Sequence, residues 1–304
     1  MRELVKISLA IVGLVVVLAA AVTAGVLLWR PSFLSGPECT VPGDPADATA
    51  VPTVDLTVVQ LQNASTINAV GLSRGIPERG RVIAVAAAYQ ESSLRNRQSG
   101  DRDSVGLFQQ RPSQGWGTAE QIKDPIYASG RFYDALLDVG GWQDLPLTDV
   151  AQAVQASAYP DAYAKWEPQA TTLVRGLSGS VVLGLTCSAG ARQPTAEAPD
   201  RPAPAGTQDA TPALTAALAA AQAELGGLTV SAVSQDGLTG TATVSVPGLD
   251  PTAAGRCLAA WAVAHGIGMG VTEVEVQGNR WVDHGWGSAG PLADPAQVQI
   301  TVAE

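Results

Sequence analysis

Histidine and cysteine are scarce in this sequence: its 304 residues include 2 histidines and 3 cysteines. A structural zinc site needs about four cysteine or histidine ligands, usually in closely spaced pairs. The histidines, His265 and His284, form no such cluster with the cysteines. We therefore expect no metal site, and no motif in the sequence indicates another cofactor.

Positive charge is also scarce. Lys and Arg number 18 against 28 Asp and Glu, which gives a formal net charge of −10, and the excess of acidic residues lies mainly in the C-terminal third. Binding to nucleic acid depends on a cationic surface that neutralises phosphates. The composition therefore excludes nucleic acid from the expected partners.

Charge is absent altogether from Ile7 to Trp29. As a helix this stretch would be about 35 Å long, and the hydrocarbon core of a bilayer is roughly 30 Å thick. Two basic residues precede the stretch and one follows it, which favours a cytoplasmic N-terminus. We expect a cell-membrane protein with a cytoplasmic end at residues 1–6, a single transmembrane helix at residues 7–29, and an extracytoplasmic C-terminal portion.

A cleaved signal peptide is the alternative for this stretch. The small residues from Ala19 to Ala24 are of the kind found at signal-peptide cleavage sites. The apolar run continues past them through Trp29, which favours an uncleaved anchor.

Proline divides the exported portion. Proline-rich stretches at residues 30–54 and 188–210 have a composition that resists both helix and core formation. We interpret the first stretch as a tether and the second as a linker. The folded parts would then be residues 55–187 and 211–304.

Apolar spacing in the first folded part predicts helices and few strands, so we expect a mainly α domain. The expected helices lie near residues 56–70, 77–94, 120–122, 128–137, 148–156 and 161–174. The second part is expected to be a small α+β domain of two helices and one sheet. Its expected helices are at residues 211–225 and 250–265, and its expected strands are near residues 228–234, 239–246, 271–276, 280–283 and 297–302.

Two of the three cysteines bracket the first folded part. Export permits a disulfide, and three cysteines allow at most one within the chain. We predict that Cys39 pairs with Cys187, which would close a loop worth roughly 5 kcal/mol in the loop-entropy model, less any strain. Cys257 lies on an apolar helical stripe with Leu258 and Trp261 and is expected to be a buried thiol.

Four short motifs follow one another in the first folded part. They are Ala88-Tyr89-Gln90-Glu91-Ser92, Gly106-Leu107-Phe108-Gln109-Gln110, Asp124-Pro125 and Ala156-Ser157-Ala158-Tyr159. Together they resemble the soluble lytic transglycosylase and goose-type lysozyme superfamily. In that family a Glu-Ser pair ends a buried helix, a Gly-Leu-Met-Gln-like segment follows, an Asp-Pro opens the next helix, and an Ala-Tyr pair closes the site. The resemblance covers roughly residues 80–170, and it implies a lysozyme-like domain that acts on peptidoglycan glycan strands.

Residues 100–116 also resemble a segment of membrane-attached proteins of actinobacteria. The sequence departs from the transglycosylase pattern at two positions: Phe108 replaces the usual Met, and Pro160 replaces the Asn that usually follows the tyrosine. Phe108 keeps an apolar wall, whereas Pro160 changes the loop that would contact the glycan.

Glu91 is the expected catalytic residue. Cleavage of a glycosidic bond needs a carboxylic acid that keeps its proton near neutral pH and gives it to the leaving oxygen. Glu91 ends an apolar helix, and burial there would raise its pKa. The alternative is a solvated carboxylate at a helix end, or one paired with Arg95 four residues on.

A hydrolase of the lysozyme kind needs a second carboxylate, and Asp101 and Asp103 are the candidates. The alternative for both is a turn-forming role, paired with Arg102 or Arg97. The resembled transglycosylases need no second carboxylate, because the N-acetyl group of the substrate stabilises the developing cation. Glu91 would then take a proton from the C6 hydroxyl of N-acetylmuramic acid and leave a 1,6-anhydro end. We expect this reaction ahead of hydrolysis.

Four residues are expected to contact the glycan: Ser92, Gln109, Gln110 and Tyr159. Amides can bond sugar hydroxyls and acetamido groups, and a phenol can orient the acid. The resemblance supports Gln109 and Tyr159 most directly. For Gln110 the alternative is an exposed amide without a substrate contact.

The C-terminal part, residues 211–304, shows no acid, nucleophile and base together. We expect it to be an interaction module for a protein of the cell envelope. For the whole chain, a non-catalytic glycan-binding or scaffold module in envelope assembly is the alternative to an enzyme.

Overall fold

The computed structural model describes residues 38–43, 52–155, 162–179, 184–187, 201–282, 285–290, 292 and 294–303, all within one compact unit, Glu38–Glu304. The expected transmembrane helix at residues 7–29 and the expected site residue Tyr159 lie outside the described residues. Within the described ranges, no helix combines the length and apolar character needed to cross a bilayer.

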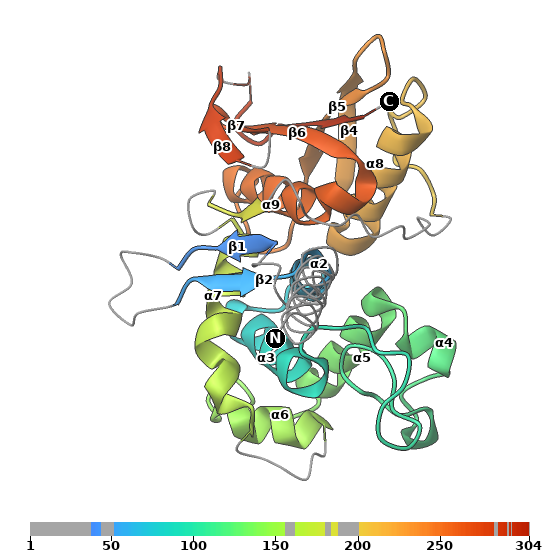
Figure 1. Cartoon of the computed structure of the whole chain (residues 1–304), viewed down its shortest axis with the longest axis vertical. Helices are drawn as coiled ribbons and strands as arrows, with labels where there is room; N and C mark the ends of the chain where they lie inside the picture. Colours follow the sequence, from blue (N-terminus) through green and yellow to red (C-terminus); the bar gives the residue numbers. More distant parts are fainter. Residues whose placement is uncertain are drawn as a thin grey trace, which may run out of the picture. The chain divides into compact units, whose positions relative to one another are not determined.

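The first part of the chain, residues 38–187, is mainly helical, and we call it the helical half (Figure 1). Its helices are α2 (Val58–Ser73), α3 (Glu78–Ser92), η2 (Pro112–Gln114), α4 (Ala119–Ile122), α5 (Pro125–Leu137), α6 (Leu147–Gln155), η4 (Ala164–Trp166) and α7 (Glu167–Leu177). The helix expected over residues 77–94 is shorter than predicted. Pro77 is its N-cap and not its first helical residue, and the helix ends at Ser92.

Helix α2 is the central helix of the described chain. Its N-terminus is closed by a capping box, in which Thr57 and Gln60 satisfy each other's backbone N–H groups. From Asn63 to Leu72 every residue of the helix is buried, as expected for a helix packed on all sides. Its neighbours are α3, α5 and α7 of the helical half and α8 (Pro212–Leu225) and α9 (Pro251–Met269) of the C-terminal part.

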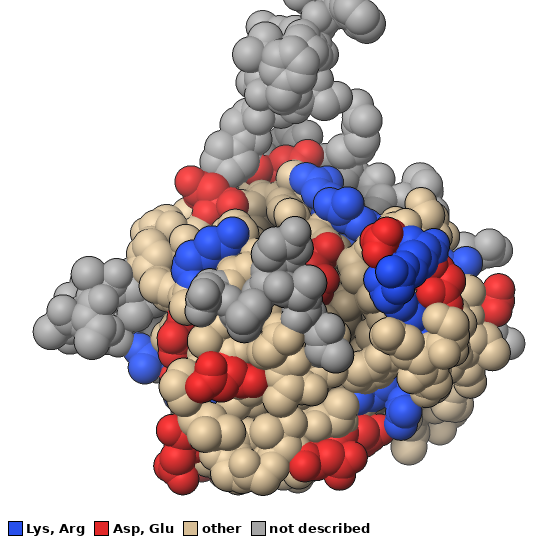
Figure 2. Space-filling model, turned by 90° about the horizontal axis from the view of Figure 1, so that it is seen from below, with Lys and Arg blue, Asp and Glu red and all other residues tan. Residues whose placement is uncertain are grey.

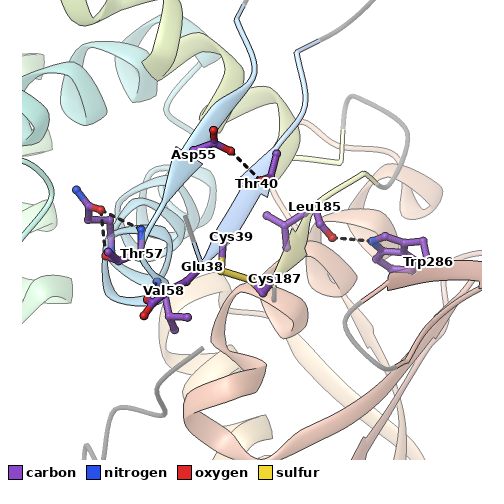
Figure 3. The surroundings of a disulfide bond; sticks show 10 residues. Glu38, Cys39, Thr40, Asp55, Thr57, Val58, Leu185, Cys187 and Trp286 are labelled. Carbon is purple, nitrogen blue, oxygen red and sulfur yellow. Dashed lines mark hydrogen bonds between the residues drawn. A yellow bond between two sulfur atoms is a disulfide. The ribbon is translucent and has the colours of Figure 1, made fainter. Parts of the chain in front are cut away.

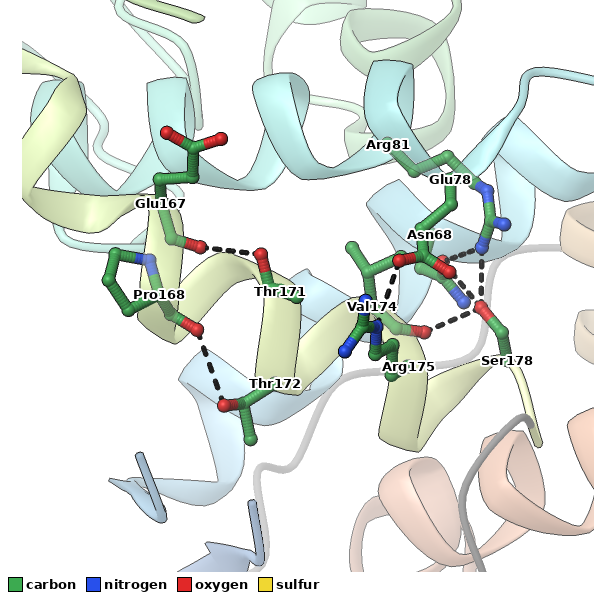
Figure 4. Close-up of polar contacts among 10 residues, drawn as sticks. All are labelled: Asn68, Glu78, Arg81, Glu167, Pro168, Thr171, Thr172, Val174, Arg175 and Ser178. Atoms are coloured by element: carbon green, nitrogen blue, oxygen red, sulfur yellow. Dashed lines mark hydrogen bonds and ion pairs between the residues drawn. The ribbon is translucent and has the colours of Figure 1, made fainter. Parts of the chain in front are cut away.

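A buried polar cluster ties α2, α3 and α7 together (Figure 4). The Arg81 guanidinium donates to Asn68 Oδ1 at 2.6 Å and to Ser178 Oγ, and Ser178 Oγ also lies 3.1 Å from Asn68 Oδ1. Near this cluster, Arg175 of α7 pairs with Glu78 of α3 at 2.9 Å. Because buried polar groups are costly unless bonded, these contacts favour one arrangement of the three helices.

A small antiparallel sheet closes the ends of the helical half. Its strands are β1 (Cys39–Val41), β2 (Val54–Leu56) and β3 (Thr186–Cys187), in the order β2-β1-β3. Cys39 and Cys187 are paired across the sheet and form a disulfide, the pair that the sequence singles out (Figure 3). The tether expected over residues 30–54 therefore contains strand β1, because backbone pairing and the disulfide hold residues 39–41 in the sheet.

The second part, residues 201–303, is the C-terminal half, an α+β arrangement of one antiparallel sheet with α8 and α9 packed on it (Figure 1). The strands are β4 (Leu228–Val233), β5 (Thr239–Val244), β6 (Val271–Val276), β7 (Asn279–Val282), β8 (Gly285–Ser288) and β9 (Val298–Val302), in the order β4-β5-β9-β6-β7-β8. Strand β8 was not predicted from the sequence. It contains two glycines, which weaken any strand pattern.

The end of the expected linker is part of the C-terminal half. Thr207 is 8% exposed and donates to Pro204 O at 2.8 Å, and Gly206 packs directly against the backbone of Val230. The expected linker is therefore packed on the C-terminal half near Gly206 and Thr207, whereas residues 188–200 lie outside the described ranges. The two folded parts also contact each other, because α8 and α9 pack on α2.

Candidate active site

The expected catalytic residue, Glu91, lies one residue before the end of α3. Ser93 and Leu94, which follow the helix, both have φ of +55°, in the left-handed region. Their N–H groups donate to Tyr89 O and Ala88 O and so close the helix. Neither residue is glycine, and this conformation costs an L-residue about 1–2 kcal/mol. Contacts from elsewhere in the fold must hold the turn.

Helix α2 supplies those contacts. Nε2 of Gln60 donates to Ser93 O at 3.0 Å, and Nδ2 of Asn63 donates to Leu94 O at 2.8 Å in a buried setting. Leu94 itself is fully buried. Side chains of a different helix therefore hold the turn that follows Glu91.

The Glu91 carboxyl is half-buried, and its Oε1 accepts a hydrogen bond of 2.6 Å from the hydroxyl of Tyr163. Burial raises the pKa of Glu91, and the hydrogen bond from Tyr163 lowers it by a smaller amount. Among the ion pairs of the described residues, none involves Glu91 or Arg95. The carboxyl is thus a desolvated acid and not a partner of Arg95.

The second motif lies next to the turn after Glu91. The N–H of Gly106 donates to Arg97 O at 2.8 Å, and Arg97 Nε contacts Ser92 O at 3.4 Å. Gly106 has φ of +80°, and a Cβ at this position would lie 2.6 Å from Ile122 O. Only glycine fits there, which accounts for the first residue of the motif.

Gln109 belongs to the loop of the second motif, and its expected glycan contact stays a prediction. It has φ of +49° and is partly exposed, and its Nε2 donates to Gly106 O at 3.1 Å. Its side chain also covers Gly100, where any Cβ would collide with the Gln109 amide. The bond to Gly106 and the close approach of Gly100 therefore fix the position of the Gln109 amide.

Gln110 and Ser92 have internal partners in place of the expected glycan contact. Gln110 is 2% exposed and its Nε2 donates to Ala128 O at 3.3 Å. Ser92 is fully buried, and its Oγ donates to Ala88 O and accepts from Arg95 N. Ser92 thus braces the backbone around Glu91, and Gln110 is tied to α5. Because both side chains are buried, the direct glycan contact expected from the sequence is corrected to a structural role.

The two candidate second carboxylates have partners of their own. Asp101 is 80% exposed at its side chain and pairs with Arg111 at 2.9 Å. Asp103 accepts hydrogen bonds from the backbone N–H and the hydroxyl of Ser113, at 2.8 and 3.0 Å. These bonds from Ser113 lower the pKa of Asp103. Both residues have the loop-forming role that the sequence left as an alternative, although the partner of Asp101 is chiefly Arg111.

The third motif begins a helix, as the resemblance implies. Asp124 is the N-cap of α5, with its Oδ1 accepting from Ile126 N at 2.9 Å, and Pro125 is the first helical residue. This helix carries Phe132, which stacks on Phe108 of the second motif with ring centroids 4.7 Å apart. Phe108 is thus buried in the core beside α5, and its expected role as an apolar wall of the site stays a prediction.

Tyr163 was missed by sequence reasoning. The Ala-Tyr pair occurs twice, at Ala158-Tyr159 and at Ala162-Tyr163, and the first copy was chosen. Tyr159 lies outside the described residues, so its expected role stays a prediction. The second Ala-Tyr pair lies four residues later and is not followed by proline, and this was the signal that could have identified Tyr163.

An aromatic pair supports the helix beside Glu91. Trp166 stacks on Tyr89 with ring centroids 4.9 Å apart, and its Nε1 donates to Gln90 Oε1 at 3.0 Å. Tyr89 and Gln90 immediately precede Glu91. Trp166, three residues after Tyr163, therefore links the tyrosine segment to the end of α3.

The surface has no extended basic region on the face shown in Figure 2, where described Lys and Arg side chains lie beside Asp and Glu. A separate groove of about 400 Å³ is lined by Val70, Ser73, Arg74, Ile126, Tyr127, Gly130, Arg131, Asp134 and Ala223. None of the expected site residues lines this groove. In the described ranges, no group of three His, Cys, Asp or Glu side chains could hold a metal ion.

No protein-family model matches this chain, and no curated protein matches it significantly. The geometry around Glu91 and the resemblance of the four motifs to lytic transglycosylases are therefore the basis for a functional proposal.

Proposed function

We propose that this chain cleaves peptidoglycan glycan strands as a lytic transglycosylase, with Glu91 as the single catalytic residue. The observation that supports this most is a half-buried carboxyl, without an ion pair among the described residues, whose pKa burial raises. An acid of this kind retains a proton closer to neutral pH than a solvated glutamic acid does.

In the first step, Glu91 donates its proton to the glycosidic oxygen between N-acetylmuramic acid and N-acetylglucosamine. The bond from C1 to this oxygen breaks, and the N-acetyl group of the substrate stabilises the cation that develops at C1. In the second step, the Glu91 carboxylate takes the proton of the C6 hydroxyl while O6 bonds to C1. A 1,6-anhydro end forms, and Glu91 regains its proton for the next cycle.

Tyr163 is the proposed positioning residue for the acid. Its hydroxyl occupies Oε1 of Glu91, which leaves Oε2 as the oxygen that carries the transferred proton. A hydrogen bond to a charged group is worth about 1.5–3 kcal/mol, so the phenol also favours the carboxylate that forms after proton transfer. Gln109 is the proposed contact for a sugar hydroxyl or acetamido group.

Hydrolysis by two carboxylates is the less favoured reaction because Asp101 and Asp103 have other partners. Asp101 is exposed and paired with Arg111, and Asp103 accepts hydrogen bonds from Ser113. These contacts favour a structural role for both residues over that of a base or nucleophile acting together with Glu91.

Membrane anchoring through residues 7–29 and an extracytoplasmic position for the rest of the chain are part of the same proposal. The disulfide between Cys39 and Cys187 supports export, because structural disulfides form mainly outside the reducing cytosol. A peptidoglycan enzyme held at the outer face of the membrane would meet its substrate there. Binding of an envelope protein by the C-terminal half also remains a proposal.

Mass spectrometry of purified peptidoglycan after incubation with the protein tests the proposal. We expect muropeptides with 1,6-anhydro ends, and none from a Glu91→Gln variant. Reducing ends would instead indicate a hydrolase. Binding of glycan by both proteins without cleavage by either would favour the non-catalytic module.

A further inference from the structure

A buried carboxylate joins the two halves of the described chain. Glu224 of α8 is 5% exposed, and its Oε1 accepts a hydrogen bond of 3.0 Å from Thr66 Oγ1 of α2. Its Oε2 accepts one of 2.8 Å from Trp261 Nε1 of α9 and lies 3.5 Å from His265 Nε2. A buried carboxylate depends on such partners, and Thr66 is the partner that the helical half supplies.

Helix α2 connects this contact to the turn after Glu91. Thr66, Asn63 and Gln60 are spaced three residues apart and so follow one side of the helix. Thr66 contacts Glu224, whereas Asn63 and Gln60 bond the carbonyls of Leu94 and Ser93. The same helix thus contacts the C-terminal half through Thr66 and the left-handed turn through Asn63 and Gln60.

We propose that the C-terminal half is a positioning element for the glycan-cleaving site: Glu224 docked on Thr66 holds α2, and α2 holds the turn that directs Glu91. This inference rests on the proposed function and deepens it. It gives residues 201–303 a role inside the enzyme, separate from any envelope partner.

The physical reason lies in the two left-handed residues of the turn. Ser93 and Leu94 adopt a backbone conformation that is unfavourable for their residue types, and such conformations persist where the surroundings over-determine them. A displacement of α2 would weaken the bonds from Gln60 and Asn63. The turn would then relax, and water would reach the Glu91 carboxyl.

Hydrogen exchange in the full-length chain tests the coupling without any need for activity. Thr66→Val removes the hydroxyl that bonds Glu224 and keeps the shape of the side chain. We expect exchange of the Ser93, Leu94 and Arg95 amides to become faster by on the order of tenfold. The matched control is Thr171→Val, whose hydroxyl donates to Glu167 O, four residues earlier in α7, at 2.8 Å. It should leave the turn unchanged.

The proposal is overturned if Thr66→Val speeds exchange in α8 and α9 while the turn keeps its wild-type protection. If Thr66→Val does not fold, Thr66→Ala replaces it, because alanine also removes the hydroxyl that bonds Glu224 and is well accommodated in a helix interior. The same two outcomes then decide. Asn63→Ser, which removes the bond to Leu94 O directly, gives the exchange rate expected for a released turn.

A pH profile of glycan cleavage provides the second readout. Water at the carboxyl would lower the pKa of Glu91, so Thr66→Val should lose activity at lower pH than the wild type, with KM little changed. A variant that is merely less stable would lose amplitude at all pH values, and that result would count against positioning. If the wild type cleaves no glycan, the proposed function fails, and hydrogen exchange alone decides the coupling.

Discussion

The hydroxyl of Tyr163 and the carboxyl of Glu91 are joined by a hydrogen bond of 2.6 Å, although 72 residues separate them in the chain. The tyrosine is fully buried, whereas the glutamate is half-buried. The contact therefore brings a buried donor from the segment before α7 to an acid at the end of α3, and it engages only Oε1 of the carboxyl.

Tyr163→Phe should reduce kcat by roughly 10- to 100-fold, since a hydrogen bond to a charged group contributes about 1.5–3 kcal/mol. The bond lowers the pKa of Glu91, so its loss should raise that pKa and move the high-pH limit of activity upward. Kinetics of muropeptide release across pH would measure both effects. Tyr127→Phe, which removes a hydroxyl bonded to Trp116 O, is the matched control. An unchanged pH profile in Tyr163→Phe would contradict the assigned role.

Glu91→Gln should abolish glycan cleavage and keep the fold, because an amide cannot donate the proton. Burial raises the folded-state pKa of Glu91, so the stability associated with the protonated form is lost as pH rises through that pKa. The variant should therefore be at least as stable as the wild type at pH 7. Thermal melting at pH 5 and pH 7 would check this. Glu78→Gln, on the same helix and paired with Arg175, should keep activity.

Asp101→Asn and Asp103→Asn should each retain most of the cleavage activity, and the products should keep their 1,6-anhydro ends. Asp103 has a pKa lowered by its bonds from Ser113, so its stabilising effect is lost as pH falls through that pKa. Asp103→Asn should accordingly be less stable than the wild type at neutral pH, with the difference shrinking in acid. Loss of activity in a folded Asp variant, together with reducing ends, would establish a two-carboxylate hydrolase.

Replacing Cys39 and Cys187 together by alanine should lower stability by about 2–5 kcal/mol, because the disulfide restricts the unfolded chain. Denaturant unfolding would measure the loss. Burial raises the pKa of the Cys257 thiol to about 12, so a thiol reagent should leave Cys257 unmodified in the native protein and modify it after unfolding. Two free thiols at Cys39 and Cys187 in protein taken from intact cells would contradict the disulfide.

Limited proteolysis should cut first within residues 188–200, where the proline-rich sequence predicts a linker. The two fragments should stay together in gel filtration, since α8 and α9 pack on α2. Thr66→Val should weaken their association, because Glu224 would lose its partner across the contact. Fragments that separate at once in the wild type would show that the halves do not hold each other.

Local signals in the amino-acid sequence by themselves mark where three of the helices begin. Asp124-Pro125, Thr211-Pro212 and Asp250-Pro251 each place a capping side chain before a proline, and each opens a helix in the structure. Such signals act between residues two or three positions apart, so no knowledge of the fold is needed to read them. The position of Glu91 near the end of an apolar helix was predictable from the apolar residues before it and from the resemblance of its motif.

Only the tertiary structure decided which side chains meet. It brought Tyr163 to Glu91, buried Gln110 against Ala128, and placed Glu224 against Thr66. These contacts join residues between 18 and 158 positions apart, and their partners depend on how helices pack and not on any local pattern. Local sequence therefore determines the candidate acid, whereas its environment and its protonation depend on the packing of distant helices around it.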